Sequence, residues 1–87
     1  MDTRVAVISI IVAQEESVAR LNSLLHDYAQ YIIGRMGLPY RAKDVNIICV
    51  AVDAPRDIIS ALSGKLGELP GVTAKTAYAN VEGAAKE

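Results

Sequence analysis

The hydrophobic pattern begins with two runs rich in Val and Ile, Val5–Ala13 and Asn46–Ala54. β-branched residues favour strands, so each run predicts a strand. A third stretch, Gly71–Ala79, alternates between two sets of residues, and this period of two predicts a last strand. The two sets are Val72, Ala74, Thr76 and Tyr78 against Thr73, Lys75, Ala77 and Ala79.

Apolar residues at spacings of three and four predict two helices between these strands. The first helix begins at Glu15–Ser17, where acidic side chains suit the positive end of the helix dipole. Its apolar stripe is Val18, Leu21, Leu25 and Tyr28. The second helix begins near Asp53-Ala54-Pro55, with Asp53 as a candidate N-cap and Pro55 in the first turn, and it ends near Gly67.

The segment between Ala29 and Asp44 allows two interpretations. The first helix could continue to Gly34, but a loop of roughly ten residues would then follow, which is uncommon in a compact domain. The alternative is a strand at residues 31–38 and a hairpin loop at 39–44, with glycines that predict an irregular or edge strand. We favour the strand. The order βαββαβ then predicts an α+β, ferredoxin-like (ACT-like) fold, a four-stranded antiparallel sheet with two helices on one face.

Length and composition predict one small domain at residues 1–80, followed by a frayed tail at 81–87. Nine basic and ten acidic residues argue against direct nucleic-acid binding, which usually requires a basic excess. A single cysteine cannot form an internal disulfide and suits a reducing, cytoplasmic location. The apolar run at 5–13 is preceded by Asp2 and followed by two glutamates, so it predicts a strand rather than an export signal. No run reaches the ~20 apolar residues of a membrane-spanning helix.

The stretch ALSGKLGELPGV, residues 61–72, raises the question of a phosphate-binding loop. Such a loop requires G-x-x-x-x-G-K-[ST] after a strand and before a helix. Here Leu66 follows Lys65, and the motif falls near a helix end. The glycines therefore predict structural roles: Gly64 for close helix packing, Gly67 as the residue after the helix, and Gly71 in a turn to the last strand.

Few residues offer chemistry. Arg35, Arg41 and Lys43 form the one local charge imbalance, and guanidinium groups suit carboxylates or phosphates. His26 is the only histidine and a candidate ligand-binding residue. One His and Cys49 are too few to bind zinc or nickel, so we expect no metal and no cofactor, and Cys49 to be a small buried hydrophobe. No nucleophile with a nearby base is evident, and we expect no enzyme activity.

Several short blocks cover nearly the whole chain up to Ala77. They are Leu24-Leu25-His26, Arg35-x-Gly37-x-Pro39-x-Arg41, Ala61-Leu62-Ser63-Gly64-Lys65-Leu66-Gly67, Gly71-Val72 and Lys75-Thr76. With these blocks the chain resembles the regulators of the iron-only hydrogenase system, small ACT-like proteins. The resemblance implies a regulatory role associated with hydrogenase maturation.

More distantly, the layout is similar to the C-terminal metal-binding domain of nickel-responsive repressors. His26 near the end of the first helix and Cys49 on the third strand match two ligand positions of that domain. The His-x-His pair of its second strand is missing here, and so is the DNA-binding segment that precedes it. The resemblance therefore implies neither a metal site nor direct DNA binding.

We expect a regulatory module that binds a small anionic effector or a partner protein. Two alternatives stay open: a scaffolding protein in hydrogenase maturation without a ligand, and a small enzyme that uses His26. We also expect a homo-oligomer, a dimer or tetramer, because both faces of the first and third strands are apolar. One face would remain uncovered in a monomer, whose open sheet face is normally polar.

Overall fold

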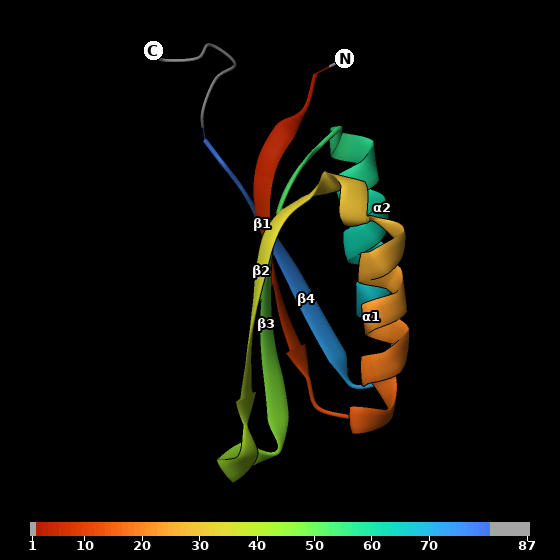
Figure 1. The fold of residues 1–87 in the computed structure, drawn as a ribbon, viewed down its shortest axis with the longest axis vertical. Helices are drawn as coiled ribbons and strands as arrows, with labels where there is room; N and C mark the ends of the chain where they lie inside the picture. The colour runs from red at the N-terminus through yellow and green to blue at the C-terminus, as the bar shows by residue number, and fades with distance from the viewer. Residues whose placement is uncertain (1, 81–87) are drawn as a thin grey trace.

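The computed structural model describes residues 2–80, which form one antiparallel sheet and two α-helices. The strands are β1 (Arg4–Val12), β2 (Ile32–Tyr40), β3 (Val45–Ala54) and β4 (Val72–Tyr78). The helices are α1 (Val18–Asp27) and α2 (Arg56–Gly67), with short 3-10 helices at Glu15–Ser17, Ala29–Tyr31 and Arg41–Lys43. Both helices lie on the same side of the sheet (Figure 1). The predicted ferredoxin-like α+β fold is confirmed.

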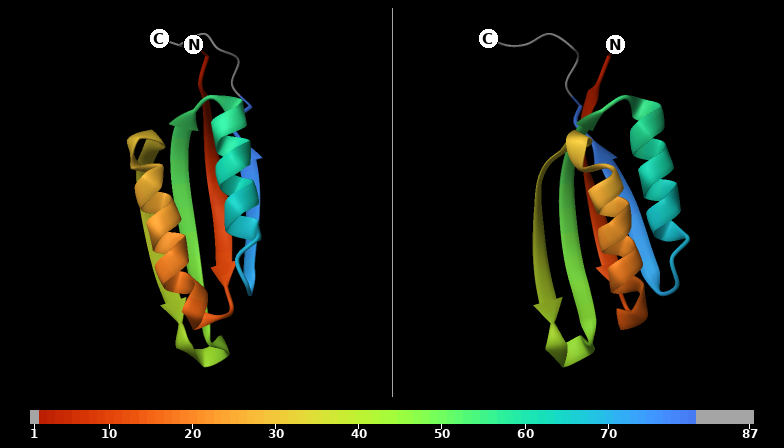
Figure 2. Two further views of the ribbon diagram at one scale, coloured as in Figure 1. Left: turned by 90° about the vertical axis from the view of Figure 1, so that its right-hand side faces the viewer. Right: turned by 45° about the vertical axis from the view of Figure 1, so that its right-hand side comes forward.

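The strand order is β2-β3-β1-β4, so β2 and β4 are the edges of the sheet. β1 pairs with both β3 and β4, whereas β2 pairs with β3 alone. Figure 2 shows α1 beside β2 and β3, and α2 beside β1 and β4. The register of β2 shifts between Ile32 and Gly34, which is a β-bulge at Ile33.

The core lies between the helices and the sheet. Alternate residues of the two central strands point into it, because successive side chains of a strand point to opposite faces. The buried strand residues are Ala6, Ile8, Ile10, Val12, Ile48, Val50, Val52 and Ala54, and the buried helix residues include Leu21, Leu25, Ile59, Leu62 and Leu66. Ser17 is the one buried polar residue of the described chain, and its Oγ donates a hydrogen bond to the Pro70 carbonyl at 2.6 Å.

The ambiguous segment forms the strand that the sequence favours, shifted by one or two residues. It continues through Pro39 to Tyr40, so the connection to β3 is only the 3-10 helix and Asp44, in left-handed conformation (φ 57°). The predicted N-cap role of Asp53 is wrong, because Asp53 belongs to β3 and the N-cap of α2 is Pro55, without a side-chain cap.

Two of the glycine interpretations also need correction. A Cβ at Gly64 would meet no atom within 4 Å, so this glycine does not serve close packing in the described chain. Gly67 is the last residue of α2 rather than the residue after it. Gly71 alone among the described glycines has a positive φ, 69°, in the turn to β4.

The predicted frayed tail lies outside the described residues. Within residues 2–80, the helices are too short or too polar to span a lipid bilayer.

Candidate functional site

Two of the predicted ligand-binding residues line one cleft between α1 and β2. Arg35 lies opposite Val50, whose side chain is in the core, so Arg35 points to the helix side of the sheet. Its Nη2 donates a hydrogen bond to Oδ1 of Asn22 on α1, at 3.1 Å. His26 lies one turn further along α1 and is exposed. The cleft has a volume of about 340 Å³.

The floor and end of this cleft are apolar. Leu25 is fully buried beneath it, and Ala29 and Ile32 close it where α1 leads into β2. A guanidinium, an amide and an imidazole thus face one small space above an aliphatic floor. This combination suits a small ligand with an anionic group and a short apolar part.

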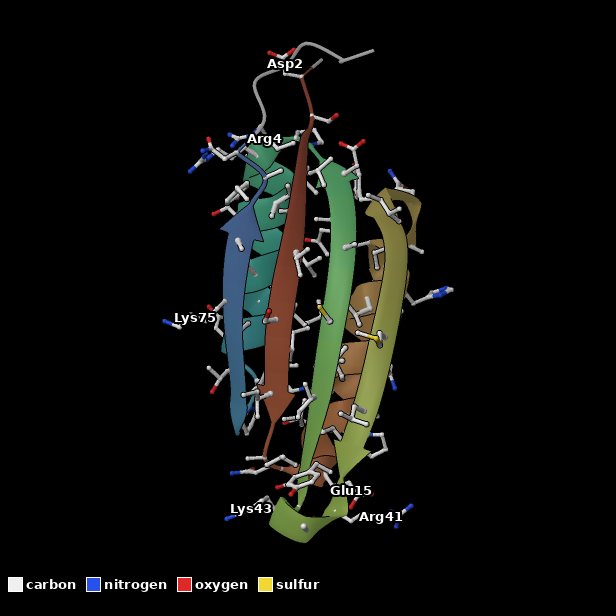
Figure 3. All side chains as sticks on the ribbon, turned by 90° about the vertical axis from the view of Figure 1, so that its left-hand side faces the viewer. Asp2, Arg4, Glu15, Arg41, Lys43 and Lys75 are labelled. Atoms are coloured by element: carbon white, nitrogen blue, oxygen red, sulfur yellow. The ribbon has the colours of Figure 1, made fainter. Side chains whose placement is uncertain are left out.

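Arg41 lies in a different place, at the turn between β2 and β3. It lines a smaller cleft of about 190 Å³, together with Glu15, Tyr40 and Asp44. Figure 3 shows Glu15, Arg41 and Lys43 at the same end of the molecule. Asp44 is close to Arg41 in sequence, and the fold brings Glu15 to the same turn. Two carboxylates beside Arg41 make this cleft less suitable for an anion.

The four predicted residues therefore do not form one site. The strand runs for five residues from Arg35 to its end at Tyr40, or about 17 Å, before the turn with Arg41 begins. Lys43 lies on the same turn as Arg41 and lines neither cleft. A single small effector can contact Arg35 with His26, but not Arg35 with Arg41.

Cys49 lies on β3 and points away from the helices, because its partners across the strands are Ser9 and Met36. It is half-buried rather than a core residue, which corrects the prediction of a buried hydrophobe. His26 is on the opposite side of the sheet. Among residues 2–80, no three His, Cys, Asp or Glu side chains gather as a metal site would require.

Lys65, from the stretch that suggested a phosphate loop, is bound to α1. Its Nζ donates a hydrogen bond to the Tyr28 hydroxyl at 2.9 Å and lies 5.3 Å from the centre of that ring. The hydrogen bond to Tyr28 is the main cause that raises the pKa of Lys65 above its ordinary value. The charge interaction with Tyr28 raises this pKa further. Lys65 thus joins α2 to the end of α1.

Sequence reasoning also missed a cationic cluster where α2 begins. The guanidinium carbons of Arg4 and Arg56 lie 5.1 Å and 4.6 Å from the ring centre of Tyr78. The three residues come from β1, α2 and β4, so no local pattern could reveal the cluster. It holds the end of β4 against the start of α2.

Comparison with known proteins identifies a family to which this chain is similar. The family model that matches residues 4–76 is TM1266-like, described as "Iron-only hydrogenase system regulator, putative". This chain belongs to the TM1266-like family. The resemblance that the sequence blocks suggested is therefore confirmed.

A solved structure supports the same relationship. The uncharacterized protein TM1266 from Thermotoga maritima matches this TM1266-like chain with a TM-score of 0.85 and 36% sequence identity. The match covers 88% of this chain and 98% of that chain. Among curated proteins there is no significant match.

Proposed function

We propose that this chain is a non-enzymatic regulatory module of the iron-only hydrogenase system that acts as a cytoplasmic homo-oligomer and binds a small anionic effector. The family description supports the regulatory role. The observation that carries effector binding is the cleft between α1 and β2, where Arg35, Asn22 and His26 converge.

The chemistry of the cleft favours a carboxylate or a phosphate. A guanidinium has five N–H donors, and the bond to Asn22 uses one of them. The planar arrangement of the remaining donors suits two oxygens of one anionic group. His26, in the last turn of α1, adds an imidazole N–H donor beside the same space.

Two alternatives differ in what they predict for the same residues. A scaffolding protein in hydrogenase maturation would bind a partner protein and no small ligand. An enzyme that uses His26 would show turnover that disappears in His26→Ala. A catalytic His usually lies beside a nucleophile and is oriented by a carboxylate. The described residues that line this cleft include neither a nucleophile nor a carboxylate, which makes the enzyme the weaker alternative.

A thermal-shift screen tests effector binding. The purified chain is screened against amino acids, nucleotides and divalent metal ions, because a ligand at a hundred times its dissociation constant adds about 2.7 kcal/mol of stability. Any hit is then measured by calorimetry in wild type, Arg35→Ala and Arg41→Ala.

We expect Arg35→Ala to weaken binding roughly tenfold to a hundredfold, since hydrogen bonds to charged groups contribute about 1.5–3 kcal/mol. Arg41→Ala is the matched control, with the same charge change in the turn after β2, and should bind like wild type. Equal affinity in all three proteins would exclude the Arg35 cleft. A screen without hits would favour the scaffolding alternative.

A further inference from the structure

The face of the sheet opposite the helices is uncovered in the described chain. Figure 1 shows the two helices on one side of the strands and no other helix or strand of residues 2–80 on the opposite side. In a monomer the side chains that point to this face, which are every second residue along each strand, would normally be polar. The register allows the residues of this face to be assigned row by row, because residues directly opposite each other share a face.

Apolar side chains predominate on this face, although the row of Met36 and Cys49 continues into Ser9 and Lys75. One row crosses the sheet as Leu38, Ile47, Ile11 and Thr73. The first three side chains of this row keep 59%, 39% and 46% of their surface exposed. Met36 in the next row is 68% exposed. Such exposure of large aliphatic side chains on neighbouring strands forms one continuous patch rather than scattered residues.

Charged groups are found at the margin of this face. Among its described strand residues only Asp53 and Lys75 are charged, one at the end of β3 and the other on the edge strand β4. Figure 3 shows Lys75 at the β4 edge, while Glu15, Arg41 and Lys43 lie at one end of the sheet. The middle of the face presents no charge that a partner would have to neutralise.

The area of this face is sufficient for a stable contact between two chains. With strands about 4.8 Å apart and residues about 3.3 Å apart, the nine paired residues of β1 and of β3, the eight of β2 and the seven of β4 give about 520 Å². Two such faces bury more than about 1,000 Å² together, the size that a specific interface needs.

The shape of the face is complementary to itself. The long side chains of Met36, Leu38 and Tyr40 form a raised strip along β2. β4 presents the short side chains of Thr73 and Ala77 on the same face, with Lys75 between them at the open edge of the sheet. A two-fold axis that runs along the strands places β2 of one chain over β4 of its partner, so that long side chains meet short ones.

We propose that this open face is the surface through which two copies of this chain associate, with their sheets packed face to face. This inference rests on the proposed homo-oligomer and names the surface that forms it. Sheets packed in this way lie about 10 Å apart, so the central residues of the face become inaccessible to solvent.

Sedimentation velocity and the reactivity of Cys49 test the inference together. Leu38→Glu and Ile11→Glu each add a charge to the face without entering the core, and both should convert the dimer to monomer at micromolar concentration. Ala61→Glu, on the exposed side of α2, is the matched control and should remain dimeric. Circular dichroism confirms that each variant is folded.

Cys49 is a direct probe because it is the only cysteine and lies in the row of Met36 and Ser9, at the centre of the face. We assume that the Cys49 thiol reacts with Ellman's reagent only in the monomer. When about nine-tenths of the chains are in dimers, the observed rate should then be about tenfold lower than in fully monomeric protein. Dilution should restore the monomer rate. This measurement uses wild-type protein, so it remains decisive if a face variant fails to fold.

The possible failures are distinguishable. A wild-type chain that sediments as a monomer overturns both the proposed oligomer and its surface. If both face variants remain oligomeric, or if Cys49 reacts in the oligomer at the same rate as in dilute protein, the open face is not the surface of association. The proposal of a homo-oligomer would still stand. Effector binding at the Arg35 cleft, on the other side of the sheet, is measured by calorimetry and does not decide between these outcomes.

Discussion

Two glycine-to-alanine substitutions, at Gly64 and at Gly71, should change stability in opposite directions. Gly64 lies in α2, is exposed, and has no atom within 4 Å of where a Cβ would be. Alanine there fits without displacement and removes the entropic cost of glycine in a helix. We expect Gly64→Ala to stabilise the protein by about 0.5–1 kcal/mol.

Gly71 is in the opposite situation. Its φ of 69° is in the left-handed region, which costs a residue with a side chain about 1–2 kcal/mol. A Cβ would also lie 2.6 Å from Cγ and 2.9 Å from Cβ of Gln14, so Gln14 would have to move. The Gly71 carbonyl accepts a hydrogen bond from the Ala13 amide at 2.7 Å, which limits how far the backbone can relax. The two variants should therefore differ by at least about 2 kcal/mol.

Urea unfolding and thermal unfolding at one fixed protein concentration measure this difference. For a domain of this size, each kcal/mol corresponds to about 4–8 °C in Tm, so the Tm values should differ by roughly 8–16 °C. The double variant Gln14→Ala with Gly71→Ala removes the steric contact between the new Cβ and the Gln14 side chain. It should therefore regain the stability lost to that contact, while the cost of the left-handed backbone conformation at residue 71 remains. Destabilisation by Gly64→Ala would contradict the reasoning, because it would mean that the space beside Gly64 is filled.

Two further predictions concern contacts that sequence reasoning missed. Ser17→Ala removes the buried donor to the Pro70 carbonyl and should cost about 1–3 kcal/mol in urea unfolding, whereas Ser23→Ala, on the exposed side of α1, should cost almost nothing. Tyr28→Phe removes the acceptor of Lys65, so the Tm should fall slightly at neutral pH. Because the folded pKa of Lys65 is raised, its contribution is present below about pH 10.5 and lost as pH rises through the folded value. The Tm difference between wild type and Tyr28→Phe should therefore disappear in that alkaline range, and a difference that persists there would contradict this role of Lys65.

The strands β1 and β3 were predictable because they are buried on one face and apolar on both, which gives long β-branched runs. The helices were predictable from their apolar stripes, of which Leu21 and Leu25 are buried as expected. The strand β2 has a mixed composition and was identified mainly because the alternative left too long a loop. Local pattern was therefore sufficient where burial is regular.

The candidate site was less predictable, and the bulge in β2 explains why. Strict alternation would place Ile32, Gly34 and Met36 on one face of the sheet. The extra residue at Ile33 lets Ile32 pack against the core while Met36 lies on the open face and Arg35 faces α1. No pattern in the sequence gives the position of this bulge. Similarly, the proximity of Glu15 to Arg41 depends on how the chain after β1 meets the β2–β3 turn, which is a tertiary contact.

The bulge also gives β2 a role in both proposals, and this leads to a last prediction. Arg35 points from β2 into the cleft beside α1, and the next residue, Met36, belongs to the open face. β2 pairs with β3 alone, and residues 33–40 are all exposed, so little besides the ladder to β3 holds this strand in the described chain. A ligand on either side of β2 would order the strand and reduce the entropic cost of binding on the other side.

Effector binding and dimerisation should therefore strengthen each other. With the compound found by the thermal-shift screen, the dissociation constant of the dimer should fall by roughly fivefold or more at saturation, a typical size for coupling between two sites. Reciprocity requires that the monomeric Leu38→Glu variant bind the compound more weakly by the same factor, although Leu38 lies on the side of the sheet away from the cleft. Ala61→Glu should show wild-type affinity in both measurements. If the dimer constant is the same with and without the compound while Arg35→Ala abolishes binding, the two surfaces are independent and β2 does not couple them.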